Sequence, residues 1–133
     1  MNSKVIHTSG KRKMAVARAT LKPGTGKVRI NSLLVDFVNS SLSRMKMKEP
    51  LIIAGDVTKN VDINVTVAGG GQTTQADAVR LAIARALVKF DKKLEPVFLT
   101  YDRTLLVADV RRKETHKPNR HGKARAKRQK SYR

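Results

Sequence analysis

The side chains of this chain that could do chemistry are its lysines and arginines, and the chemistry they favour is the binding of phosphate. The chain has 29 of these cations against 10 acids, a formal net charge of +19. Residues 111–133 hold eleven cations and one acid, Glu114, and so carry +10. Arginine grips phosphate with two parallel hydrogen bonds, and lysine acts as a point charge. The candidate contacts with RNA in this segment are Arg111, Arg112, Lys113, Lys117, Arg120, Lys123, Arg125, Lys127 and Arg128.

A second cationic segment lies at the beginning of the chain. Residues 1–35 contain eight cations and no acid. One interpretation is a solvated sheet edge, because lysines on edge strands discourage pairing with other chains. The complete lack of balancing acids favours a nucleic-acid-binding surface instead. The candidate RNA contacts here are Lys11, Arg12, Lys13, Arg18 and Arg29.

A glycine-rich loop, residues 69–71, joins a predicted strand to a predicted helix. Such loops let the backbone approach an anion, and the helix that follows favours negative charge at its first turn. No Gly-Lys-Ser/Thr follows, so this is not a Walker loop. For Gly69 and Gly70 a tight turn that needs positive φ is the favoured interpretation. A backbone contact with an RNA phosphate remains open for Gly71, Gln72 and Thr73.

Other chemistries find little support in the sequence. There is no cysteine, and the histidines at positions 7, 116 and 121 lack the spacing of zinc ligands. The acids are scattered over separate predicted elements, so neither a catalytic site nor a cofactor is expected. No aliphatic run is longer than that of residues 51–54, which is far too short for a bilayer. Since the tail also lacks bulky apolar anchors, nucleic acid is favoured over a membrane as partner.

The elements that must position these cations follow from hydrophobic period and turn residues. We expect strands over residues 5–8, 14–22, 27–30, 33–38 and 61–67, with 14–22 and 27–30 paired as a hairpin. Helices are expected over 41–48, 49–54, 75–91 and 95–102, and residues 105–107 could add an edge strand. Residues 1–110 should form one globular RNA-binding core. Residues 111–133 should form an extended tail that is disordered alone in water, because it has almost no apolar surface to bury.

Three stretches together resemble a known family. They are Ser9-Gly10-Lys11-Arg12-Lys13 with Ala15 to Ala19, the three glycines with the alanine-rich helix after them, and the basic end Gln129-Lys130-Ser131-Tyr132-Arg133. In this order they closely resemble the ribosomal protein S-nine family of the small subunit, in its archaeal and eukaryotic form. The resemblance covers nearly the whole chain.

The resemblance implies an α+β fold, with a mixed β-sheet, two main helices packed on one face, a left-handed βαβ crossover and a basic C-terminal tail. The second domain of ribosomal protein S-five has the same architecture. The implied role is structural: the family binds ribosomal RNA in the head of the small subunit, beside proteins S-seven, S-ten and S-fourteen, in the cytoplasmic ribosome. Its tail reaches the peptidyl-site tRNA, a role that would fall here on Lys130, Ser131, Tyr132 and Arg133.

Two other functions remain as alternatives on the residues alone. A chromosome-compacting or general nucleic-acid-coating protein would also combine a basic core with a basic tail. An enzyme of the related small-molecule kinase fold would use residues 69–73 for nucleotide phosphate, and would need a catalytic acid or lysine beside that loop.

Overall fold

The computed structural model describes residues 4–126 and has an α+β fold. Five strands form one mixed sheet in the order β1-β2-β5-β3-β4, and three helices and three short 3-10 turns complete the body. The strands are β1 (Ile6–Arg12), β2 (Ala15–Pro23), β3 (Val28–Ile30), β4 (Leu33–Leu34) and β5 (Val61–Ala68). The helices are α1 (Ser41–Ala54), α2 (Gln72–Phe90) and α3 (Leu94–Tyr101), and the 3-10 turns are η1 (Val35–Phe37), η2 (Gly55–Asn60) and η3 (Arg103–Leu105).

The predicted hairpin of residues 14–22 and 27–30 is wrong, because β5 lies between β2 and β3. β2 pairs with β1 through a turn at Lys13 and Met14, and β3 runs parallel to β5. The reason lies in Asp62 of β5. Its Oδ1 accepts hydrogen bonds from the backbone nitrogens of Thr25 and Lys27, each at 2.9 Å. The residues that suggested a tight turn are therefore bonded to β5, and they carry the chain across that strand.

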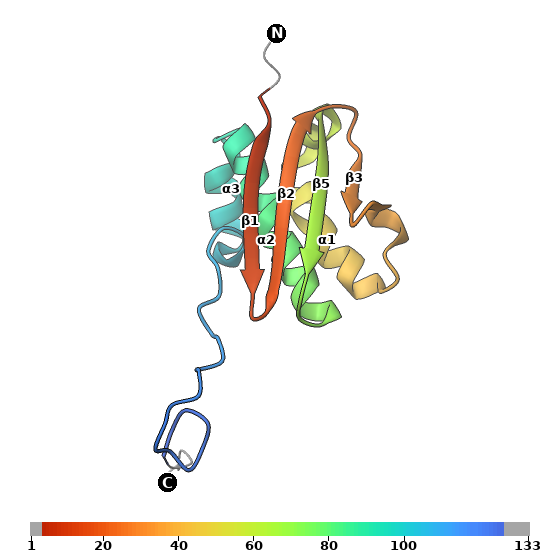
Figure 1. Cartoon of the computed structure of the whole chain (residues 1–133). Helices are drawn as coiled ribbons and strands as arrows, with labels where there is room; N and C mark the ends of the chain where they lie inside the picture. Colours follow the sequence, from red (N-terminus) through yellow and green to blue (C-terminus); the bar gives the residue numbers. More distant parts are fainter. Residues whose placement is uncertain (1–3, 127–133) are drawn as a thin grey trace.

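The connection from β3 to β5 has the unusual hand that the resemblance implies. In Figure 1 the helices lie behind the sheet, both strands run downwards, and β5 lies to the left of β3. The path from β3 through α1 to β5 is therefore left-handed, whereas nearly all such crossovers are right-handed. The mixed sheet with two main helices on one face is also confirmed (Figure 1).

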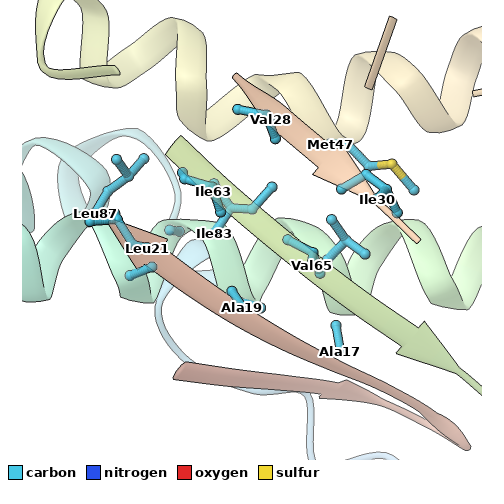
Figure 2. Packing of buried hydrophobic residues seen from close by; sticks show 14 of the residues in the cluster. Ala17, Ala19, Leu21, Val28, Ile30, Met47, Ile63, Val65, Ile83 and Leu87 are labelled. Atoms are coloured by element: carbon cyan, nitrogen blue, oxygen red, sulfur yellow. The ribbon is translucent and has the colours of Figure 1, made fainter. Parts of the chain in front are cut away.

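The hydrophobic core lies between this sheet and the helices α1 and α2. Alternate residues of β2 and β5 are buried, and the alanines of β2 leave room for α2 to approach closely. Figure 2 shows Ala17, Ala19 and Leu21 of β2 near Ile63 and Val65 of β5, with the side chains of α2 beside them. The opposite side of each strand is therefore left to face solvent.

Gly10 lies where β1 and α2 approach each other closely. A Cβ atom at this position would overlap the carbonyl oxygen of Ala78 and lie 2.7 Å from the nitrogen of Ala82. The hydroxyl of Thr8 donates to the oxygen of Ala82 at 2.9 Å, which fixes β1 on the same turn of the helix. Gly10 is thus part of a strand, where the absence of a side chain permits tight packing.

Three further predictions about the elements are wrong. Of the strand expected over residues 33–38 only Leu33–Leu34 is formed, because the chain turns into η1 at Val35, which is buried. Residues 41–54 form one helix rather than two, although Pro50 lies inside it. Met47, Pro50 and Ala54 recur at helical spacing on one face and are all buried, so tertiary packing outweighs the cost of the proline. Residues 105–107 form no strand, because Leu105 is fully buried as the last residue of η3 and the chain turns there.

Candidate nucleic-acid interface

The turn between β1 and β2 and the glycine-rich loop meet at one end of the body, the lower end in Figure 1. Lys13 at the turn adopts φ 52°, which is uncommon for a residue with a side chain, and it is exposed. Gly69 and Gly70 pack against the backbone of Met14 and Ala15, where Cβ atoms would be too close. Two sequence features more than fifty residues apart therefore form one end of the molecule.

The glycine loop is a tight turn, as its sequence favours. Gly69 and Gly70 adopt φ values of 79° and 66°, in the left-handed region that suits glycine. Gly71 is the N-cap of α2, and its nitrogen donates to the hydroxyl of Thr74 at 2.9 Å. Gln72 and Thr73 follow as exposed residues of the first turn. Their contact with phosphate stays a prediction.

Arg12 lies apart from the other cations of the first hairpin. Its guanidinium Nη1 is 2.8 Å from Oδ2 of Asp109, and its Nε is 3.9 Å from Oδ2 of Asp77. Nη1 is buried and has no aligned hydrogen-bond acceptor among residues 4–126, so the contact with Asp109 is an ion pair. The side chain is only 18% exposed. Arg12 therefore joins the hairpin to the residues from which the tail begins.

The beginning of the tail is held at two more points. Arg85 of α2 donates from Nε to the carbonyl oxygen of Leu106 at 3.1 Å and from Nη1 to that of Ser9 at 3.0 Å. Hydrogen bonds from Arg111 lower the pKa of Asp109, and the charge of Arg12 lowers it further. Asp109 thus stays ionised and keeps the chain beside β1 up to the first residues of the tail.

The remaining candidate cations of the body lie on the side of the sheet that no described helix covers (Figure 1). We call this side the open face. Lys11, Arg18 and Arg29 are exposed there, and each alternates with buried neighbours in its strand. Sequence reasoning missed Lys22 on the same face, although the period of two along β2 predicts its direction.

Charge is sorted between the two sides of the body, because its ion pairs lie away from the open face. Asp77 pairs with Lys46 at 3.0 Å, and Arg80 contacts both Glu49 and Asp102, although other exposed cations such as Lys92 and Lys93 have no acid partner. Apart from Arg12, no ion pair within residues 4–126 involves the cations of the hairpin, of the open face or of the loop before β3. Those cations are Lys11, Lys13, Arg18, Lys22, Lys27 and Arg29.

The described part of the tail leaves the body as an exposed chain without strands or helices (Figure 1). Glu114, its one acid, pairs with Arg125 at 3.0 Å and with Lys117 at 3.6 Å. The candidates that lie exposed on this segment are Arg111, Arg112, Lys113, Lys117, Arg120, Lys123 and Arg125. The candidates Lys127, Arg128, Lys130, Ser131, Tyr132 and Arg133 lie outside the described residues.

Other kinds of site are not formed by the part of the chain that the structure describes. No three histidine, cysteine or acidic side chains between residues 4 and 126 gather as metal ligands. No helix within the same residues is long and apolar enough to cross a membrane.

Comparison with known proteins assigns the chain to a family. The model of the family described as ribosomal protein S9/S16 matches residues 10–133. A protein of Methanococcus maripaludis named small ribosomal subunit protein uS9 is 51% identical over 98% of this chain and 99% of its own length. The protein of the same name from Methanococcus vannielii is 49% identical over the same shares of the two chains. This is a family of structural ribosomal proteins and not of enzymes, and the chain belongs to it as a protein of the small ribosomal subunit.

Proposed function

We propose that this chain binds ribosomal RNA in the head of the small subunit, and that its tail reaches the peptidyl-site tRNA during translation. It does so in the cytoplasmic ribosome, beside the head proteins S-seven, S-ten and S-fourteen. One observation carries the proposal: Lys11, Lys13, Arg18, Lys22, Lys27 and Arg29 have no acid partner in residues 4–126, while the less exposed cations Arg12 and Arg80 are paired. Unpaired cations that gather on one surface indicate a site that binds nucleic acid.

The mechanism is electrostatic. Each cation that neutralises a phosphate releases condensed counterions, so the affinity for RNA falls with salt by a slope of about 0.7 to 0.9 per phosphate contact. Lys11, Lys13 and the arginines of the open face supply contacts from the rigid body. The cations of the tail supply more along a path that the RNA itself determines.

The body, residues 1–110, serves in this proposal as an anchor for the tail, residues 111–133. Arg12 and Arg85 hold the segment that leads into the tail against β1, so the tail starts from a fixed point. The tail carries +10 in 23 residues and extends to at most about 75 Å. Its last residues, Lys130, Ser131, Tyr132 and Arg133, would then meet the tRNA, with Tyr132 offering a flat ring to a base or ribose.

Binding of the full chain to a transcript of the small-subunit head RNA tests the first part. We expect a steep fall of affinity with salt, and a clear preference for this RNA over duplex DNA of equal length at one salt concentration. Equal affinity for the two would favour a general nucleic-acid-coating protein and would contradict the proposal.

Removal of residues 130–133 tests the second part. Small subunits reconstituted with the truncated chain should contain it in normal amount but bind peptidyl-site tRNA more weakly than subunits with the full chain. Replacement of Lys92 and Lys93 by glutamine is the control, because both lysines are exposed on the body. Unchanged tRNA affinity after truncation would refute the role of the tail tip.

A further inference from the structure

The open face carries more than cations. The exposed side chains of β1, β2, β5 and β3 on this side are polar throughout, and the half-buried Val16 is the only sizeable apolar group among them. Neutral groups that form hydrogen bonds stand between the basic ones. The face comprises His7, Ser9, Lys11, Arg18, Thr20, Lys22, Arg29, Asn64, Thr66 and one acid, Asp62, which lies beside Lys22 and accepts hydrogen bonds from the backbone nitrogens of Thr25 and Lys27.

The strand register arranges these side chains in rows across the sheet. Thr20 lies beside Asn64, and Asn64 lies beside Arg29, so amide and hydroxyl groups lead up to the arginine. In the next row Arg18 lies beside Thr66. Strand spacing puts the backbones of Arg18 and Arg29 roughly 12 Å apart, with Asn64 and Thr66 between them on β5.

A shallow hollow lies on the same face. It is lined by Arg29, Asn64, Val65 and Thr66 from the sheet and by Asn31 and Ser32 from the turn between β3 and β4. The amide of Asn31 is bonded to the backbone of Val67, so one cation, Arg29, and three neutral polar side chains, Ser32, Asn64 and Thr66, are left to meet a ligand there. A phosphate and a neighbouring ribose hydroxyl have the groups that such a lining would bind.

The composition of the face also indicates whether single-stranded or helical RNA would bind there. Single-stranded RNA is usually held by aromatic side chains on which its bases stack, as on the sheets of RNA-recognition domains. Among residues 4–126 no aromatic side chain other than the imidazole of His7 lies on the open face. Helical RNA instead presents phosphates and 2′-hydroxyls along a wide, shallow minor groove, which guanidinium, amide and hydroxyl groups can contact.

We infer that the open face is a second RNA-binding surface, and that it holds the sugar-phosphate backbone of an RNA helix. Arg18 and Arg29 bind phosphates, and Asn64 and Thr66 form hydrogen bonds with 2′-hydroxyls between them. The inference rests on the proposed function, to which it adds the form of RNA that the open face binds and the contacts of Asn64 and Thr66 with ribose.

The double variant Arg18→Gln/Arg29→Gln of the full chain tests the phosphate contacts. Both side chains are exposed, so the core should be unaffected and the melting temperature should stay near that of the parent. Against a short duplex RNA, we expect the slope of log affinity on log salt to fall by roughly 1.8, for two lost contacts. The control Lys92→Gln/Lys93→Gln removes the same charge from the body outside the open face and should leave the slope unchanged.

A second double variant, Asn64→Val/Thr66→Val, tests the recognition of ribose. Valine keeps the strand propensity of β5 and removes the polar groups without changing the charge. The parent chain should bind duplex RNA more tightly than duplex DNA of the same sequence, and this variant should lose most of that preference at an unchanged salt slope. An unchanged preference would overturn the assignment of Asn64 and Thr66.

The outcomes separate this inference from the proposed function. If the parent chain binds head RNA steeply with salt but Arg18→Gln/Arg29→Gln behaves like its control, the open face does not bind RNA, and an acidic protein becomes its expected partner. If the parent chain itself shows no salt-dependent affinity for head RNA, the proposed function fails first.

Discussion

Replacement of Gly10 by alanine should destabilise the body far more than one added methyl group suggests. The new Cβ would overlap the carbonyl oxygen of Ala78 and stand 2.7 Å from the nitrogen of Ala82. Both atoms belong to the backbone of α2, so no side chain can rotate away to make room. Since carbon atoms pack at about 3.5 Å or more, β1 and α2 must separate by about 1 Å.

The cost follows from what that separation disrupts. Overpacking of a core typically costs about 1 to 3 kcal/mol, and a clash with helix backbone belongs at the upper end of that range. The separation also stretches the hydrogen bond from Thr8 to Ala82 and that from Arg85 to Ser9. We therefore expect a loss of about 3 kcal/mol in the free energy of unfolding. For a body of this size the melting temperature should fall by roughly 12 to 20 °C.

Urea and thermal denaturation, followed by circular dichroism, would measure this loss. Gly71→Ser is the matched control, because a Cβ at Gly71 meets nothing within 4 Å and serine is a good N-cap. The control should be as stable as the parent. A loss below about 0.5 kcal/mol in Gly10→Ala would refute the close approach of β1 and α2 as the reason for this glycine.

Three further perturbations have expected outcomes. Hydrogen bonds from Thr104, and the contact with Arg80, lower the pKa of Asp102, so its ionised form stabilises the fold above its ordinary pKa. Asp102→Asn should be less stable than the parent at pH 7, and urea titrations should show the difference vanishing as the pH falls below about 4. Arg80→Ala leaves two carboxylates without their cation and should cost about 2 kcal/mol in the same assay, less than for a fully buried pair; a loss within error of zero would count against the network. Arg12→Gln should keep the salt slope of RNA binding, because acids already hold Arg12, whereas Lys11→Gln should lower it by about 0.9; equal slopes in the two variants would contradict this division.

The sequence predicts best those elements whose pattern is local. β5 alternates valine and isoleucine with polar residues over its whole length, and its predicted bounds differ from the observed ones by one residue. The buried residues of α2 recur at helical period, so the sequence predicts this helix clearly. The helix begins at Gln72, three residues earlier than predicted. The N-cap of α2 is Gly71, and glycine indicates the start of a helix less strongly than serine, aspartate or asparagine does.

Strand order could not be predicted in the same way. The pairing of β3 with β5 joins residues more than thirty positions apart, and nothing in the short segment 27–30 indicates a parallel partner. The side chain of Asp62 contributes to this arrangement, because its carboxylate accepts hydrogen bonds from the backbone nitrogens of Thr25 and Lys27. A carboxylate in a strand has no local signature for that role.

The candidate site shows the same limit. Arg12 stands between two lysines and looks like them in the sequence, yet it is bound by an acid almost a hundred residues away. Alternation along β1 puts Lys11 and Arg12 on opposite sides of the sheet. This is the one local feature of the sequence that predicts different surroundings for the two side chains. The identity of the acid that meets Arg12 depends on the path of the chain after α3.

The sorting of charge follows from the cost of burying ions, and it links the fold to the function. Arg12 and Arg80 lie where the helices and the sheet meet, with side chains only 18% and 13% exposed, so each needs carboxylates at hand to offset the loss of water. Arg18 and Arg29 remain in water and need no such partner in the free protein. A chain with few acids can therefore neutralise half-buried cations such as Arg12 and Arg80 and still leave the open face with a net positive charge, since Asp62 is the one acid of its described strands. On the proposed function, that face would bind RNA without the competition from internal ion pairs that would weaken its contacts with phosphate.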